Sequence, residues 1–179
     1  EAMAHERATF LALRGSDQAA ALRHVFFAER GAPRPARLKD VTPLPLRNAA
    51  VIGGGTMGAG IAAALRDAGL PVVLSERDAA ALERGVANLR GIFDGGVKRG
   101  KLTPAQAEAR MAGVTPSTDY AALADVDLVI EAVFEEIGVK RAVFEALGRA
   151  CRPDAVLATN TSYLDPRAIA EGLPNPGRV

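Results

Sequence analysis

The chain has 179 residues, of which 49% are hydrophobic and 24% are charged, and its formal net charge is +1. This composition is typical of a soluble globular protein, and the near balance of charge gives no electrostatic basis for binding nucleic acid or a membrane surface. The apolar runs are short and broken, which excludes a membrane-spanning helix.

Cellular location is predicted from cysteine content and from the first residues. The single cysteine, Cys151, allows no intrachain disulfide, which is compatible with a reducing compartment. The first residues also lack the apolar core of a signal peptide. We therefore expect a cytoplasmic protein. Because the chain does not begin with Met, we also expect it to be a piece of a longer protein.

Residues 1–47 have the pattern of a helical segment followed by a proline-rich linker. Gly15 separates two stretches of helical pattern, and Ser16 is a suitable N-cap for the second, which should stop at Gly31. The prolines after Gly31 predict an extended connection. The two helices carry apolar side chains without a partner along the sequence, namely Phe10, Leu22, Phe26 and Phe27. We therefore expect the helices to pack on the following domain or to mediate self-association.

From residue 48 the pattern changes to strands that alternate with helices. Strands are expected at 49–52, 72–75, 114–115, 127–133 and 155–158, with a sixth beginning at Val179. Helices are expected at 56–68, 78–97 and 137–150, with others starting near 104 and 166. This alternation predicts an α/β fold, a Rossmann-type doubly wound parallel sheet that binds ligands at the carboxyl ends of its strands.

A G-x-G-x-x-G turn joins the first of these strands to its helix. Gly53 permits the tight turn, Gly55 lets a pyrophosphate approach the backbone, and Gly58 lets the helix pack closely on the sheet. The helix begins at Thr56 and Met57. The free N–H groups of these residues and the positive end of the helix dipole favour a phosphate. The motif predicts a dinucleotide site, although a glycine-rich turn without a ligand is the alternative.

Glu76, at the end of the second strand, indicates which dinucleotide binds. A carboxylate there accepts hydrogen bonds from the ribose hydroxyls and repels a 2′-phosphate, so NAD is favoured over NADP. Arg77 weakens this preference, because an arginine at this place accommodates a 2′-phosphate.

Three later segments carry a resemblance to a known family: residues 127–135, Val139-Lys140 and residues 158–162. Together with the glycine turn they closely resemble the L-3-hydroxyacyl-CoA dehydrogenase family over about residues 48–179. Residues 21–30 look like the helix that joins the enoyl-CoA hydratase half to the dehydrogenase half in multifunctional enzymes of fatty acid oxidation. The resemblance implies a boundary between residues 47 and 48.

The resemblance implies an activity, oxidation of the 3-hydroxyl of a 3-hydroxyacyl-CoA with NAD as the acceptor. Ser162 and Asn160 match catalytic positions of the family near the substrate oxygen and the nicotinamide. Glu135 and Lys140 match positions at the nicotinamide end of the cofactor. From the residues alone, other interpretations stay open: a turn serine for Ser162, a helix-end charge for Glu135 and a solvated helix lysine for Lys140.

The sequence departs from the family pattern in two places. Tyr163 stands where a second serine is usual. The chain also stops before the position at which the family has its catalytic histidine and its substrate domain. Its only histidines, His5 and His24, are implausible as the base, and no metal is expected because neither has a second ligand nearby. We therefore expect a cofactor-binding piece that is inactive by itself, with acyl-CoA bound mainly by the missing domain.

Two other functions stay open at this point. One is a non-catalytic NAD-binding regulatory module. The other is a related NAD(P)-dependent dehydrogenase that acts on small hydroxy acids.

Overall fold

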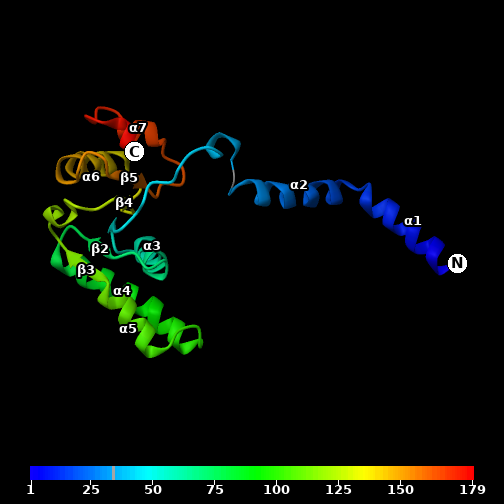
Figure 1. The fold of residues 1–179 in the computed structure, drawn as a ribbon, viewed down its shortest axis with the longest axis horizontal. Coiled ribbons are helices and arrows are strands. Elements are labelled where there is room, and N and C mark those ends of the chain that lie inside the picture. Colours follow the sequence, from blue (N-terminus) through cyan, green and yellow to red (C-terminus); the bar gives the residue numbers. More distant parts are fainter. Residues whose placement is uncertain (34) are drawn as a thin grey trace. The chain divides into compact units, whose positions relative to one another are not determined.

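The computed structural model describes residues 1–33 and 35–179, and its internal contacts divide the chain into two units, Glu1–Leu44 and Pro45–Val179. The first unit contains the helices α1 (Ala2–Arg14) and α2 (Asp17–Gly31), as expected (Figure 1). The Ser16 hydroxyl accepts a hydrogen bond from the Ala19 N–H at 3.2 Å, which makes it the predicted N-cap. No residue of either helix is buried.

The linker differs from the expectation of an extended chain. A short 3-10 helix occupies Ala36–Leu38, because carbonyl and N–H groups three residues apart pair there, as between Pro35 and Leu38. Arg34, which the predicted linker includes, lies outside the described residues. In the described part of the chain no helix is both long and apolar enough to cross a membrane.

The second unit is built on a five-stranded sheet in which every pair of neighbours is parallel. Its strands are β1 (Ala49–Ile52), β2 (Val72–Ser75), β3 (Val114–Ser117), β4 (Leu128–Glu131) and β5 (Val156–Thr159). Their order across the sheet is β3-β2-β1-β4-β5, which is the Rossmann order and confirms the predicted fold class.

Two strand predictions need correction. The fourth strand stops at Glu131 instead of residue 133, because the Glu131 side chain accepts the Val133 N–H at 2.7 Å and turns the backbone out of the ladder. The predicted sixth strand is absent from the described residues. A 3-10 helix, Pro176–Arg178, comes directly before Val179, whose N–H donates to the Pro176 carbonyl instead of to a strand.

Helices cover both faces of the sheet (Figure 1). They are α3 (Thr56–Asp67), α4 (Ala79–Lys98), α5 (Pro104–Ala112), α6 (Ile137–Ala150) and α7 (Pro166–Ala170), with a 3-10 helix at Tyr120–Leu123. Alternate residues of β1 face opposite cores: Val51 packs with α3, α4 and α5, while Ala50 and Ile52 pack with α6 and α7. Every residue of β1 is buried, as a central parallel strand requires.

The topology also locates the crevice for a ligand. From β1 the chain proceeds outward to β2 and β3, and it then returns to place β4 on the other side of β1. The connections after β1 and β4 therefore leave in opposite directions. In open α/β sheets ligands bind at this switch point, beyond the carboxyl ends of the strands.

Candidate functional site

The glycine turn lies at the switch point, directly after β1. Gly53 has a φ of 99°, and a Cβ there would come within 2.6 Å of the Ala132 carbonyl oxygen, so no other residue fits without strain. A Cβ on Gly58 would collide with the Gly53 carbonyl oxygen, which means that α3 touches the turn with bare backbone. Both glycines are therefore required by packing, whatever ligand binds.

Gly55 differs from these two because the space beside it is open. A Cβ at Gly55 would meet nothing within 4 Å. Gly55 is also the N-cap of α3, and both Thr56 and Met57 at the helix start are exposed residues. Among residues 1–33 and 35–179, no side chain accepts their N–H groups. An open space bounded by free N–H groups at a helix N-terminus fits a phosphate group.

Glu76 follows β2 and lies beside this turn. Its Oε1 accepts the Gly54 N–H at 2.7 Å, and its Oε2 accepts only the Arg77 N–H, at a long 3.4 Å, so that Oε2 can also accept a ligand hydroxyl. The Arg77 guanidinium pairs with the Asp78 carboxylate at 3.0 Å, and its side chain is 83% exposed. Because this contact directs the arginine toward the start of α4, the electrostatics beside Glu76 favour a ribose with a free 2′-hydroxyl.

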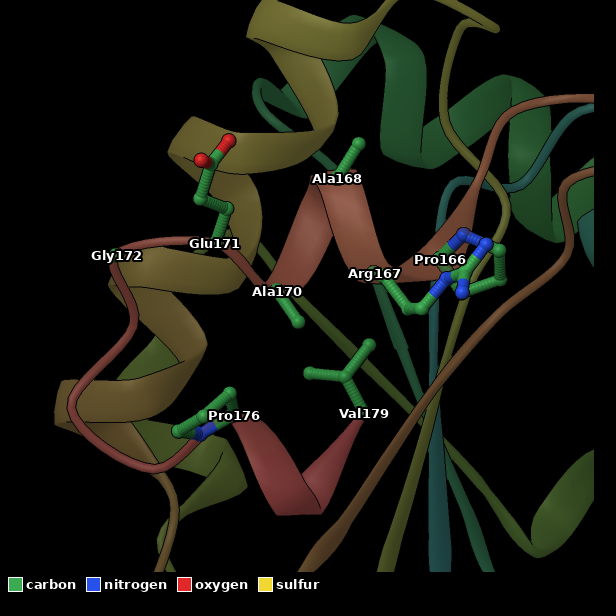
Figure 2. Close-up of a pocket in the computed structure, with 8 residues that line it drawn as sticks. All are labelled: Pro166, Arg167, Ala168, Ala170, Glu171, Gly172, Pro176 and Val179. Atoms are coloured by element: carbon green, nitrogen blue, oxygen red, sulfur yellow. The ribbon is translucent and has the colours of Figure 1, made fainter.

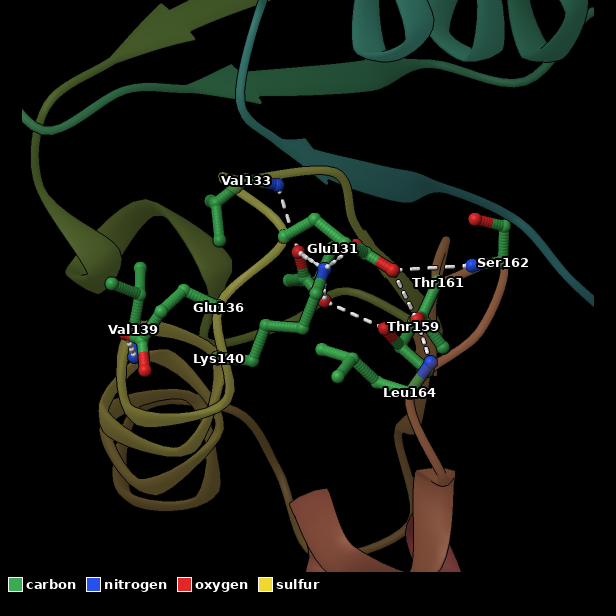
Figure 3. A network of polar contacts seen from close by, with 10 residues as sticks. Glu131, Val133, Glu136, Val139, Lys140, Thr159, Thr161, Ser162 and Leu164 are labelled. Atoms are coloured by element: carbon green, nitrogen blue, oxygen red, sulfur yellow. Dashed lines mark hydrogen bonds and ion pairs between the residues drawn. The ribbon is translucent and has the colours of Figure 1, made fainter.

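A second polar group lies across the switch point, where β4 and β5 end (Figure 3). Glu131 and Lys140 are both completely buried, and the Lys140 Nζ lies 2.7 Å and 3.0 Å from the two Glu131 carboxylate oxygens. The Thr159 hydroxyl donates to Glu131 Oε2 at 2.7 Å. A buried ion pair is tolerated when such hydrogen bonds satisfy its polar atoms.

Glu135 extends this group to the loop after β5. Its Oε2 lies 3.0 Å from Lys140 Nζ, and its Oε1 accepts hydrogen bonds from the Thr161 hydroxyl and, at 3.2 Å, from the Ser162 N–H. The Thr161 hydrogen bond, assisted by Lys140 and the Ser162 N–H, lowers the pKa of Glu135 below its usual range. Glu135 is therefore ionised at neutral pH and holds the Ser162 backbone in place.

The structure brings the predicted nicotinamide-end residues together on one side of the switch point. Lys140 is fully buried, so it is not the solvated helix lysine of the alternative interpretation, and three carboxylate contacts surround its ammonium. The Asn160 N–H continues the ladder to the Glu131 carbonyl at 2.8 Å. Ser162 is exposed just beyond it.

Three members of this group were not predicted as site residues from the sequence: Glu131, Thr159 and Thr161. Glu131 did carry a signal, because a carboxylate inside a run of strand residues requires a buried partner. The partner is Lys140, nine residues later. The threonines carried no such signal, since threonine is common in strands and turns.

A cavity of about 510 Å³ lies elsewhere, between α7 and the turn at Pro176–Arg178 (Figure 2). Arg167 and Glu171 are the charged residues that line it, and it contains none of the residues predicted to bind or react. In residues 1–33 and 35–179 there is also no cluster of three His, Cys, Asp or Glu side chains that could hold a metal ion.

A parallel sheet in this order, with a glycine turn at its switch point and an acid after the adjacent strand, defines a dinucleotide-binding Rossmann domain. Residues 48–179 match the family described as 3-hydroxyacyl-CoA dehydrogenase, NAD binding domain, and the chain belongs to this family. NAD is therefore the cofactor of the domain, in agreement with the open space at Gly55 and with the position of Glu76.

The relatives are much longer proteins. The chain is 39% identical to the peroxisomal fatty acid beta-oxidation multifunctional protein AIM1 of Arabidopsis thaliana over 92% of its length, but this is 23% of the relative. It is also 39% identical to a peroxisomal bifunctional enzyme of Cavia porcellus, with 97% of the chain and 24% of the relative covered. The crystal structure of 3-hydroxybutyryl-CoA dehydrogenase from Escherichia coli is 43% identical, with a TM-score of 0.71 over 75% of this chain and 29% of that one.

The expectation of a cytoplasmic location is wrong. Several relatives are named as peroxisomal or glyoxysomal proteins, including those of Arabidopsis thaliana, Oryza sativa and Cavia porcellus. The prediction failed because a single unpaired cysteine is compatible with any reducing compartment and does not distinguish among them.

Proposed function

We propose that this chain is the NAD-binding part of an enzyme that oxidises the 3-hydroxyl group of a 3-hydroxyacyl-CoA to a ketone in fatty acid β-oxidation. When bound, NAD accepts the hydride from the carbon that carries the hydroxyl. The observation that supports this activity most strongly is the position of Ser162. It is exposed next to an ionised Glu135 and lies across the switch point from the glycine turn.

The adenosine and pyrophosphate part of the cofactor is assigned to the turn. Gly55 and the N–H groups of Thr56 and Met57 would hold the phosphates, and Gly53 and Gly58 keep this backbone in place. Glu76 would accept the ribose hydroxyls with the carboxylate oxygen that Gly54 does not use.

The nicotinamide and the substrate oxygen are assigned to the other side. Asn160 and Ser162 would hydrogen-bond them and act as catalytic residues. Glu135 would line the nicotinamide site. Lys140 acts in this proposal by holding Glu135, since its ammonium already contacts the Glu131 and Glu135 carboxylates inside the protein. Lys140 is thus a positioning residue.

A general base is needed to remove the hydroxyl proton, and residues 48–179 contain no histidine. Loss of such a base slows proton transfer by a factor of about 10² to 10⁴. We therefore propose that the chain binds NAD but does not oxidise the substrate by itself, and that further residues of a longer protein supply the base and most of the acyl-CoA contacts. The relatives, of which the chain covers about a quarter, support this proposal.

The same comparison supports a division of the chain. Residues 1–47 would be the helical segment and linker that follow a hydratase-like half, and 48–179 would be the NAD-binding domain. The family match begins at residue 48, and the internal contacts of the structure divide the chain close by, after Leu44.

Calorimetric titration with NAD and, separately, with NADP tests the cofactor site. We expect heat of binding with NAD and little with NADP. Gly55→Asp places a carboxylate in the open phosphate space, while aspartate at an N-cap favours the helix, so this variant should lose NAD binding without loss of thermal stability.

Gly60→Ala is the matched control, because Gly60 lies in the same helix and a Cβ there meets nothing within 4 Å. It should bind NAD as the unmodified chain does. Equal NAD binding by Gly55→Asp and Gly60→Ala would show that the phosphate does not bind at the turn, and it would refute the proposed cofactor position.

A further inference from the structure

Gly54, the residue between the first two motif glycines, is held by Glu76, which follows β2, and by two residues of α4. Its N–H donates to Glu76 Oε1 at 2.7 Å, and its carbonyl oxygen accepts from Asn88 Nδ2 of α4 at 3.0 Å. A Cβ on Gly54 would lie 2.6 Å from the Cα of Gly85, also on α4. The turn therefore rests on the backbone of α4 as well as on β1 and α3.

The Asn88 hydrogen bond determines the direction of a neighbouring N–H group. A trans peptide is planar, with its carbonyl and its N–H on opposite sides. Because the Gly54 carbonyl points to Asn88, the Gly55 N–H of the same peptide points away from α4. A rotation of this peptide would turn the carbonyl oxygen, which carries partial negative charge, toward the space where a phosphate is expected.

Gly85 limits the position of the turn by its size. A Cβ at Gly85 would come within 3.0 Å of the Gly54 Cα and 3.5 Å of the Gly54 oxygen. These neighbours are backbone atoms, so the turn itself would have to shift by a few tenths of an ångström. Gly91 lies on the same helix and would place its Cβ in open space.

We propose that Gly85 and Asn88 of α4 are positioning residues for the cofactor. Gly85 determines how closely the glycine turn approaches α4. Asn88 orients the peptide that presents the Gly55 N–H to the pyrophosphate. The proposal rests on the cofactor position given above. It extends the set of residues that determine NAD affinity to a helix that contributes no residue to the G-x-G-x-x-G motif.

The test compares the dissociation constants of NAD, ADP-ribose and adenosine for the full chain and its variants. Asn88→Ala should weaken NAD and ADP-ribose roughly threefold to tenfold, the loss of one net hydrogen bond, and Gly85→Ala should weaken both on the order of tenfold. Adenosine lacks the phosphates, so its affinity should be unchanged in Asn88→Ala, which frees only the Gly54 carbonyl and leaves the Gly54 N–H on Glu76. Gly91→Ala should bind all three ligands as the unmodified chain does.

Two results would overturn the proposal. One is an NAD affinity for Asn88→Ala and Gly85→Ala equal to that of Gly91→Ala. The other is a parallel loss of adenosine and NAD binding in Asn88→Ala, since this indicates general damage to the fold. Asn88 is exposed, so its variant remains informative if Gly85→Ala does not fold.

Failure of the cofactor position itself gives a different result, in which the unmodified chain binds neither NAD nor ADP-ribose. Amide hydrogen exchange of Gly54 and Gly55 then still tests the role of α4. Faster exchange in Asn88→Ala than in Gly91→Ala supports the tether, and equal exchange refutes it.

Discussion

Glu131 and Lys140 illustrate how single residues in this domain depend on one another. Both are completely buried, so bulk solvent does not reach either side chain. Removing two charges from water is costly, and the cost is offset only while the pair and its hydrogen bonds from Thr159 and the Val133 N–H remain intact. The pair also connects β4 to α6 and thereby places Glu135.

We therefore predict a large effect of Lys140→Met, which leaves Glu131 buried without its cation. Breaking a buried pair in this way costs about 3–5 kcal/mol in the free energy of unfolding, measurable by urea denaturation. Arg149→Met is the comparison, because Arg149 pairs with Glu145 one turn away on the same helix in a largely exposed position. An exposed pair of this kind contributes about 0.3–0.5 kcal/mol. Similar losses for the two variants would contradict this account of the buried pair.

Asp127, immediately before β4, makes stability depend on pH. The side-chain and backbone hydrogen bonds from Arg47, together with Arg152, lower the pKa of its carboxyl far below the usual range. A carboxyl whose pKa is lower in the folded state adds stability that is fully present above its unfolded pKa of about 3.9 and is lost as the pH falls below that value.

Urea midpoints measured from about pH 6 down to about pH 3 test this, because the unfolded carboxyl takes up its proton within this range. The unmodified chain should lose stability toward the acid end. Asp127→Asn should start lower and decline less steeply, since the amide has no charge to lose. Parallel curves for the two proteins would show that Asp127 does not contribute to the acid sensitivity.

At the scale of elements, helix ends are specified by local sequence. Thr103 begins α5 with a capping box: its hydroxyl accepts the Gln106 N–H at 3.2 Å, and the Gln106 side chain accepts the Thr103 N–H at 2.8 Å. Pro104 occupies the first helical position, where its missing N–H costs nothing. These residues lie within one turn of each other, so the start of the helix was predictable from sequence.

Thr103→Ala should lower the free energy of unfolding by about 1 kcal/mol, since it removes the acceptor for the Gln106 N–H. Thr103→Ser retains a hydroxyl and should be close to the unmodified chain in the same thermal or urea unfolding experiment. If the alanine and serine variants unfold alike, the cap does not stabilise the domain.

At the scale of the whole molecule, the two units differ in how they bury apolar side chains. The second unit has two continuous cores on either side of its sheet. In α1 and α2, by contrast, no residue is buried, and large apolar side chains such as Phe10, Leu22 and Phe27 are more than half exposed. Exposed apolar groups of this size favour association with another surface.

We predict that the chain self-associates through these helices at high concentration. Sedimentation equilibrium should give a mass that rises with concentration, and Phe10→Ser combined with Phe27→Ser should reduce this rise. Met57→Ser is the control, because Met57 is also exposed but lies outside these helices. A chain that stays monomeric at every concentration, with α1 and α2 mobile, would refute the prediction.

The sequence by itself determined the features that depend on neighbours along the chain. These features follow from patterns within a few residues or within one strand–helix unit. They are the parallel α/β fold, the glycine turn after β1, the helix caps at Ser16 and Thr103, and the acid at Glu76. The resemblance to the dehydrogenase family also came from short motifs, and the family match confirmed it.

Only the tertiary structure decided which distant residues meet. It paired Glu131 with Lys140, placed Glu135 under the Ser162 N–H, ended β4 early, and set Gly85 of α4 against Gly54. Such contacts depend on the register of strands and on the packing of helices across the sheet, and a side chain's position in sequence does not specify them. Lys140 shows the reason: its neighbours along the chain suit a surface helix, while the fold buries it among carboxylates.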